Sequence, residues 1–233
     1  MNEAAWPMST GTVIERPSYL ELALILLTGV LHVAIELAWG AGIYGLRAAW
    51  PERLYTVSVT VIWGTYVLWR GVREPSLRSR WGFRLDNALP AFCTCLLFVI
   101  PATAILALYA LIANRLAIPT TLWIALLVYP LYGIAQQFAL QVLVTRNLRA
   151  LISRQALRIF LVAAFFSAAH FPNQPLMTLT FIAGLGFTLV YEVHPNLWVV
   201  GIAHGFLGAL AYHWVLGLDP GAEIIAVIQQ AVQ

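Results

Sequence analysis

Residues 165–210 read FFSAAHFPNQPLMTLTFIAGLGFTLVYEVHPNLWVVGIAHGFLGAL and contain most of two long apolar runs, 176–193 and 197–216. Roughly 20 apolar residues are enough to cross the hydrocarbon core of a bilayer as a helix. Water is absent from that core, so a helix, which pairs its own backbone groups, is the economical structure there. This stretch therefore predicts two consecutive membrane helices.

The rest of the chain has the same character. Of its 233 residues, 61% are hydrophobic and only 10% are charged, which is typical of an integral membrane protein and excludes an ordinary soluble domain. Seven apolar runs can be counted, at residues 19–46, 54–69, 87–113, 122–145, 157–170, 176–193 and 197–216. We therefore expect an all-α polytopic bundle of about seven spans, with residues 1–233 forming one integral membrane domain.

The basic residues indicate orientation. All 13 lysine-or-arginine positions are arginines, and most lie between predicted spans, in the connections 70–84 and 146–158. These connections and Arg16 fall on one side of the predicted bundle; Arg47, Arg53 and Arg115 fall on the other. The positive-inside rule then places the N-terminus in the cytoplasm, with lipid headgroups rather than nucleic acid as partners of the arginines.

Two further expectations concern location. The tail after residue 216 would lie outside as a short amphipathic helix on the membrane surface. Exclusive use of arginine over lysine hints at a bacterial source, so a bacterial inner membrane is the expected location.

Polar side chains inside apolar spans are costly, so they are the first candidates for function. The stretch YGIAQQFALQVLVTRNLR, residues 132–149, carries Gln136, Gln137 and Gln141. Gln137 and Gln141 are four residues apart and share one helix face, whereas Gln136 is rotated by about 100°. Glutamines that bridge neighbouring helices are also common as structural contacts in membranes, so both interpretations stay open.

Histidines and one glutamate form the other polar candidates. His32 and Glu36 share a helix face in the first run, where they either satisfy each other or present a reactive carboxylate. His170 closes the fifth run and His204 lies within the seventh.

Part of the chain resembles a known family. Phe166 and His170 form a Phe-x-x-x-His pattern followed by FPN at 171–173, and VYEVHPNLWVVGIAHGF leads to His204. These features resemble the CPBP or Abi family of intramembrane glutamate-type proteases, which includes the CAAX endopeptidase. The resemblance covers about residues 125–212, which we expect to be the core of the domain and to adopt the CAAX-endopeptidase-like helical fold.

The departures from the family pattern bear on chemistry. Gln136 and Gln137 occupy the places of the two motif glutamates, Gln141 that of the motif arginine, and Gly208 that of an asparagine. In the family, a glutamate with histidine help is taken to activate water, and asparagine with histidine to steady the oxyanion. Glutamine cannot accept a proton at ordinary pH, so the inherited general base is missing. Loss of the arginine is coherent, because a buried guanidinium would have no carboxylate to pair with.

Three functions remain open on this resemblance. The favoured one is a non-proteolytic binder of a lipid, an isoprenoid or a transmembrane peptide in an intramembrane cavity. The second is a non-peptidase enzyme acting on an isoprenoid-like substrate, in which His170 and His204 bind a divalent metal, with Glu36 or Glu192 as a further ligand, or act as acid and base. The third is an intramembrane protease that uses Glu36 as a displaced base.

All three functions require one shared site. We expect Gln136, Gln137, Gln141, His170 and His204 to converge in one cavity in the inner half to middle of the bilayer.

Overall fold

The computed structural model describes residues 17–40 and 50–232, and every regular element in that part of the chain is helical. The elements are α1 (Tyr19–Ile35), η1 (Glu36–Gly40), α2 (Trp50–Arg73), α3 (Pro75–Arg80), α4 (Ala88–Ile112), α5 (Thr120–Gln137), η2 (Phe138–Thr145), α6 (Arg146–Leu148), α7 (Gln155–Ala168), α8 (Gln174–Val193), α9 (Leu197–Ala211), η3 (Tyr212–Leu216) and α10 (Pro220–Val232), where η denotes π-helical turns. The expected all-α membrane bundle is confirmed.

A helix lies at each of the seven predicted runs. Five of the described helical segments are long and apolar enough to cross a membrane: Tyr19–Ala38, Ala88–Ile112, Thr120–Leu148, Gln174–Val193 and Leu197–Leu216. The other two predicted runs correspond to α2 and α7, and α7, with 14 residues, is about 21 Å long. Seven spans are compatible with this arrangement and stay a prediction. Positions 41–46 of the first predicted run lie outside the described residues.

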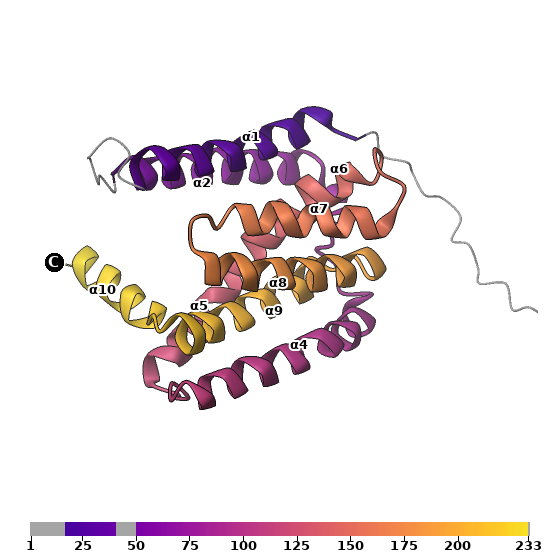
Figure 1. The fold of residues 1–233 in the computed structure, drawn as a ribbon. Helices are drawn as coiled ribbons and strands as arrows, with labels where there is room; N and C mark the ends of the chain where they lie inside the picture. The colour runs from indigo at the N-terminus through magenta and orange to yellow at the C-terminus, as the bar shows by residue number, and fades with distance from the viewer. Residues whose placement is uncertain (1–16, 41–49, 233) are drawn as a thin grey trace, which may run out of the picture.

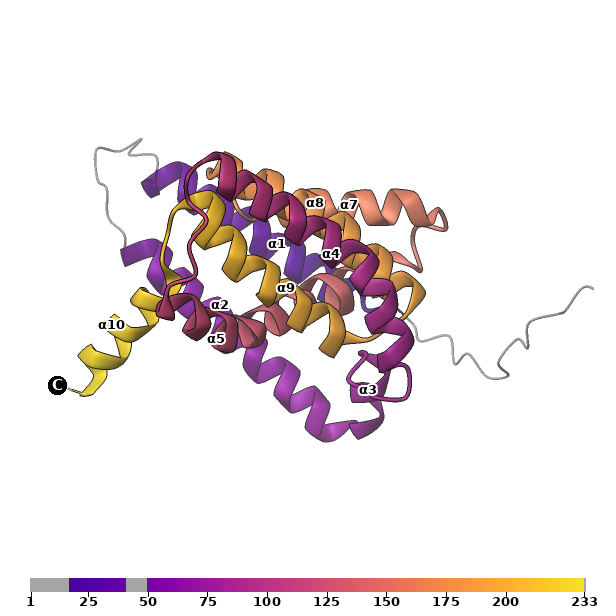
Figure 2. The ribbon, with the colours of Figure 1, turned by 90° about the horizontal axis from the view of Figure 1, so that it is seen from below.

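The helices pack side by side (Figure 1). α1 and α2 lie along one edge of the bundle and α4 along the opposite edge, with α5, α7, α8 and α9 between them. Seen from below, α3 is at one end of the bundle and α10 at the other (Figure 2). The helices that carry the glutamines and His204, α5 and α9, therefore lie inside the bundle.

Both arginine-rich connections lie at the same end. Arg70, at the end of α2, donates to Glu21 Oε1 at 2.6 Å, and Asn147 in α6 lies 3.4 Å from Glu21 Oε2. The 70–84 and 146–158 connections therefore meet around the N-terminal turn of α1, as the alternation of spans requires. The assignment of this end to the cytoplasm remains a prediction.

Side-chain caps fix where several helices begin. The oxygens of Ser18, Asn173 and Asn196 accept from backbone N–H groups of Glu21, Leu176 and Val199, at 3.2, 3.1 and 3.0 Å. Such caps satisfy N–H groups that have no partner within the helix. Asn173 and Asn196 thereby set the first turns of α8 and α9, the helices that form two walls of the candidate site.

Glycines allow α5 and α9 to approach closely. A Cβ at Gly133 would lie 2.3 Å from the Gly201 carbonyl oxygen, and one at Gly205 would lie 2.4 Å from the Tyr129 carbonyl oxygen. Small residues at a membrane-helix interface permit such backbone contact. The close approach brings the end of α5 within side-chain reach of His204.

The helix that carries the glutamines changes form at the site. α5 ends at Gln137 and continues as the π-helical η2 from Phe138 to Thr145. Within η2 the Thr145 hydroxyl lies 2.9 Å from the Leu140 carbonyl, five residues earlier. π-helical turns are uncommon and often occur at functional sites.

The predicted C-terminal helix is present as α10. Asp219 caps it by accepting from the Ala222 N–H at 3.0 Å and from the Thr121 hydroxyl at 2.7 Å. α10 leaves the bundle beyond this contact (Figure 1). Its position on an outer membrane surface stays a prediction.

Candidate functional site

His204 is held between the two adjacent glutamines. Its Nδ1 lies 3.0 Å from Gln137 Nε2, and its Nε2 lies 2.8 Å from Gln136 Oε1. An amide nitrogen donates and an amide oxygen accepts, so the ring accepts at Nδ1 and donates from Nε2. His204 is therefore a neutral imidazole, protonated at Nε2, with both ring nitrogens in use.

The hydrogen bonds continue from Gln137 into the protein interior. Gln141 Nε2 donates to Gln137 Oε1 at 2.9 Å and lies 3.1 Å from Thr188 Oγ1, while the Thr145 hydroxyl lies 3.0 Å from Gln141 Oε1. All four of these side chains are fully buried. Polar side chains can be buried at little cost in free energy when they are neutral and hydrogen-bonded to one another. A buried polar group without a hydrogen-bond partner would cost free energy.

The second histidine, His170, packs against the same phenylalanine as His204. His170 Nδ1 lies 2.8 Å from the Phe166 carbonyl oxygen, so Nδ1 carries the proton and Nε2 is left as an acceptor. The Phe166 ring is 4.9 Å from the His170 ring and 5.4 Å from the His204 ring, measured between centroids. The two histidines thus share one aromatic neighbour and have opposite tautomers.

A cavity of about 170 Å³ adjoins both histidines and Gln136. Its walls come from α4, α5, α8, α9 and η3, and are apolar apart from a few uncharged side chains. The polar members of the lining are Gln136, His170, His204, Thr180, Tyr129, Tyr132 and Tyr212. No Arg, Asp or Glu is among the described residues that line the cavity, so it is a neutral site.

The cavity opens on the side of the bundle. Its lining includes Ile105 of α4, Tyr132 of α5 and Ile182 of α8, which are 67, 59 and 51% exposed. Each of these residues lies well inside its helix rather than at an end. Because these helices are long and apolar enough to span the membrane, the opening faces lipid.

Gly208, which the resemblance aligns with an asparagine, has open space beside it. A Cβ at Gly208 would meet only the Tyr129 ring, at 3.6 Å, which is an ordinary contact. Tyr129 in turn packs against Tyr132 and Tyr212, with ring centroids 6.2 and 5.8 Å away. This part of the cavity is bounded by tyrosines.

Glu36 is not brought into this cavity. It begins η1, after α1, and is absent from the residues that line the space beside the histidines. His32, its expected partner in sequence, stacks with Tyr55 at a centroid distance of 6.1 Å. Glu36 is therefore not among the described residues that line the cavity beside His170 and His204.

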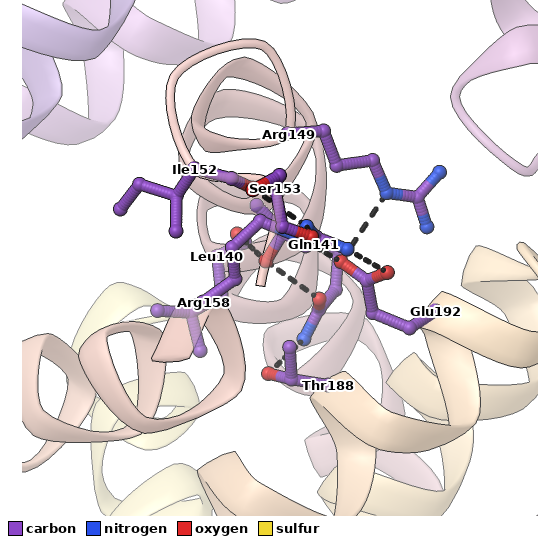
Figure 3. Close-up of polar contacts among 9 residues, drawn as sticks. Leu140, Gln141, Arg149, Ile152, Ser153, Arg158, Thr188 and Glu192 are labelled. Atoms are coloured by element: carbon purple, nitrogen blue, oxygen red, sulfur yellow. Dashed lines mark hydrogen bonds and ion pairs between the residues drawn. The ribbon is translucent and has the colours of Figure 1, made fainter. Parts of the chain in front are cut away.

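Glu192, the other carboxylate considered as a metal ligand, forms ion pairs with two arginines (Figure 3). Arg158 reaches Glu192 with Nε at 3.1 Å and Nη2 at 2.8 Å, and Arg149 approaches it at 3.2 Å. Arg158 also donates to the carbonyl oxygens of Ile152 and Ser153, at 2.7 and 2.9 Å. Figure 3 places this ion pair beside the contact of Gln141 with Thr188, one helical turn earlier on α8.

The described side chains around the cavity offer few ligands for a metal ion. No group of three His, Cys, Asp or Glu side chains that could hold an ion occurs within residues 17–40 and 50–232. His204 has no ring nitrogen to spare, which leaves His170 Nε2 as a single candidate ligand, whereas a catalytic zinc site commonly has three protein ligands.

Sequence reasoning did not single out Thr145, Thr188 or the three tyrosines. Thr145 follows Gln141 by four residues, and this spacing was a usable signal for a side-chain contact. Thr188 and the tyrosines come from other helices and carry no comparable signal in the sequence.

Comparison with known proteins agrees with the resemblance. Residues 118–210 match the family model described as type II CAAX prenyl endopeptidase Rce1-like. No curated protein and no solved structure shows a match to the chain. The matched segment runs from just before α5 to the end of α9 and thus contains the glutamines and both histidines.

Proposed function

We propose that this CAAX-protease-like membrane protein is a non-proteolytic binder of a hydrophobic ligand, which occupies the neutral cavity beside Gln136, His170 and His204. The observation that carries the proposal is the state of His204. Both of its ring nitrogens are hydrogen-bonded to the neutral amides of Gln136 and Gln137. A histidine held in this way is a structural part of the cavity wall.

The chemistry of the lining argues against peptide hydrolysis. General-base catalysis needs a group that can take a proton from water within hydrogen-bond reach. A glutamine amide is not such a group, and Glu36 and Glu192 are absent from the cavity lining. His170 Nε2 is the basic nitrogen left in the cavity lining, and no carboxylate is among the described residues of that lining.

The shape of the cavity favours an apolar occupant. Its volume of about 170 Å³ is close to that of an engineered apolar cavity of about 150 Å³ that takes up benzene. The enclosed space therefore accommodates one end of a lipid, an isoprenoid or a transmembrane peptide. The rest of such a ligand would extend through the opening beside Ile105 and Ile182 into the bilayer.

Native mass spectrometry with lipid extraction tests the proposal without a guessed ligand. The purified protein is compared with Gly208→Leu, whose side chain would enter the cavity, and with Gly64→Leu, where nothing lies within 4 Å of the new Cβ. We expect one hydrophobic molecule to be retained by the wild type and by Gly64→Leu and lost from Gly208→Leu.

Two results would contradict the proposal. One is equal retention of bulk phospholipid alone by all three proteins. The other is cleavage of a membrane peptide by the wild type that disappears in Glu36→Gln, because that outcome would restore a carboxylate-dependent protease.

A further inference from the structure

Some polar atoms of the cavity lining have no hydrogen-bond partner in the described protein. These atoms indicate which chemical group the ligand carries at its buried end. The lining contains Gln136, His170 and His204, and the hydrogen bonds among them can be followed atom by atom. A donor or acceptor that is used in a hydrogen bond between these residues cannot bind a ligand. The donors and acceptors that remain therefore define the ligand's chemistry.

Gln136 retains its donors. Its Oε1 accepts the hydrogen of His204 Nε2 at 2.8 Å, which turns the amide so that the nitrogen is the free end. No hydrogen bond between that nitrogen and another described residue is present. Two N–H donors of Gln136 are thus available at the cavity wall.

His170 retains an acceptor. Its Nδ1 proton goes to the Phe166 carbonyl, so Nε2 has a lone pair, for which the described part of the chain offers no donor. The His170 and His204 rings both contact the Phe166 ring, with centroids 4.9 and 5.4 Å from it, and Gln136, His170 and His204 all line the same cavity. The free donor and the free acceptor therefore face one cavity.

One small chemical group satisfies both. A hydroxyl accepts from an amide N–H and donates to an imidazole nitrogen, and it is neutral. A carboxylate or phosphate lacks the donor and would enter a cavity with no described cationic side chain in its lining, and an ammonium lacks the acceptor. An ether accepts but cannot donate.

From this geometry we infer that the ligand is a lipid alcohol, whose hydroxyl lies between Gln136 Nε2 and His170 Nε2 and whose chain leaves through the lipid-facing opening. The inference rests on the proposed binding function and adds the chemical class of the ligand. The hydrocarbon chain of the ligand would lie next to uncharged cavity-lining tyrosines, at positions 129, 132 and 212.

A matched series of probes tests the inference on the wild-type protein itself. Hexadecan-1-ol, its methyl ether, hexadecane and palmitate share one chain and differ at the end group. Their occupancies are compared by native mass spectrometry after delipidation. We expect the alcohol to bind roughly tenfold more tightly than the ether, the value of one additional hydrogen bond.

Variants assign the preference to residues. His170→Leu removes the acceptor and should reduce the alcohol-to-ether ratio to about one, while the same change at half-buried His194, which ends α8 and is not among the cavity-lining residues, should leave it unaltered. Equal binding of alcohol and ether to the wild type, or tighter binding of palmitate, would overturn the inference.

The outcomes separate the two proposals. If all four chains bind equally and Gly208→Leu excludes them, the binding function stands and the lipid alcohol is wrong. If none of the chains binds to the wild type, both proposals fail.

Discussion

Gln137 donates an amide hydrogen to Nδ1 of His204 across 3.0 Å. A second hydrogen bond fixes the orientation of this amide, because Gln137 Oε1 accepts from Gln141 Nε2 at 2.9 Å. An ionised glutamate at this position could not donate, so the amide of Gln137 favours this tautomer of the ring. The Gln137 amide thus sets the protonation pattern of His204.

Removal of the Gln137 amide should destabilise the protein. Gln137→Leu leaves His204 Nδ1 and a Gln141 N–H without their partner in a fully buried position. Each buried unsatisfied group costs about 1–3 kcal/mol, so thermal unfolding in detergent should begin at a clearly lower temperature. Gln155→Leu, at an exposed residue, is the matched control. Equal melting temperatures for the two variants would show that the buried chain does not contribute to stability.

The two histidines should have opposite neutral tautomers. His204 accepts at Nδ1 and His170 donates from Nδ1, so the nitrogen chemical shifts of their rings should show protonated Nε2 and protonated Nδ1, respectively. Nitrogen-15 NMR of the histidine-labelled protein at neutral pH measures this, with His204→Gln and His170→Gln used for assignment. A doubly protonated His204 would contradict the hydrogen-bond pattern.

The helices of this fold could be predicted from sequence because each apolar run carries its own signal. Runs such as 87–113 and 197–216 are uniform, and the structure has α4 and α9–η3 there. The resemblance at Phe166 and His170 likewise depends on residues four apart in the chain. In both cases the information is local.

The features of the structure that could not be predicted from the sequence do not follow from local sequence patterns. The expected run 122–145 is interrupted by π-helical turns from Phe138, a backbone change that no hydrophobic pattern encodes. Glu192 is bound by Arg158 and Arg149, which are 34 and 43 residues away, so its role as an ion-pair partner requires the packed structure. The tyrosine wall beside Gly208 also combines residues from α5 and η3.

Arg158 should contribute much more to stability than Arg149, although both contact Glu192. The Arg158 side chain is 9% exposed and the Arg149 side chain 36%, and Glu192 is 4% exposed. Breaking a buried pair costs about 3–5 kcal/mol, against about 1 kcal/mol or less for an exposed one. Arg158→Met should therefore lower the melting temperature strongly and Arg149→Met only slightly.

A double variant checks the reason for this difference. Arg158→Met with Glu192→Met removes both charges and should recover most of the loss, because an apolar pair leaves no buried carboxylate. If the double variant is as unstable as Arg158→Met, the bonds of Arg158 to the Ile152 and Ser153 carbonyls matter more than the ion pair.

The docking of α10 should weaken in acid. The backbone N–H of Ala222 and the Thr121 hydroxyl lower the pKa of Asp219 below its usual 3.8. Such a carboxylate stabilises the folded state above its usual pKa, and the contribution is lost as pH falls through the lowered value. The protection of the α10 amides against hydrogen exchange, relative to the intrinsic rate at each pH, should decrease below that range. Asp219→Asn should remove this pH dependence, and Asp86→Asn, in a distant connection, should preserve it.

Two glycines of α9 that are close in sequence should respond oppositely to alanine. At Gly205 a Cβ would lie 2.4 Å from the Tyr129 carbonyl oxygen and 2.5 Å from Pro130 backbone atoms, so α5 and α9 would have to separate. Overpacking of this kind costs about 1–3 kcal/mol, and here it would also pull His204 away from the glutamines. Gly208→Ala meets only the Tyr129 ring at 3.6 Å and gains helix propensity, so it should melt at or above the wild-type temperature. Measured melting temperatures in the reverse order would mean that the close contact of α5 with α9 does not hold the site together.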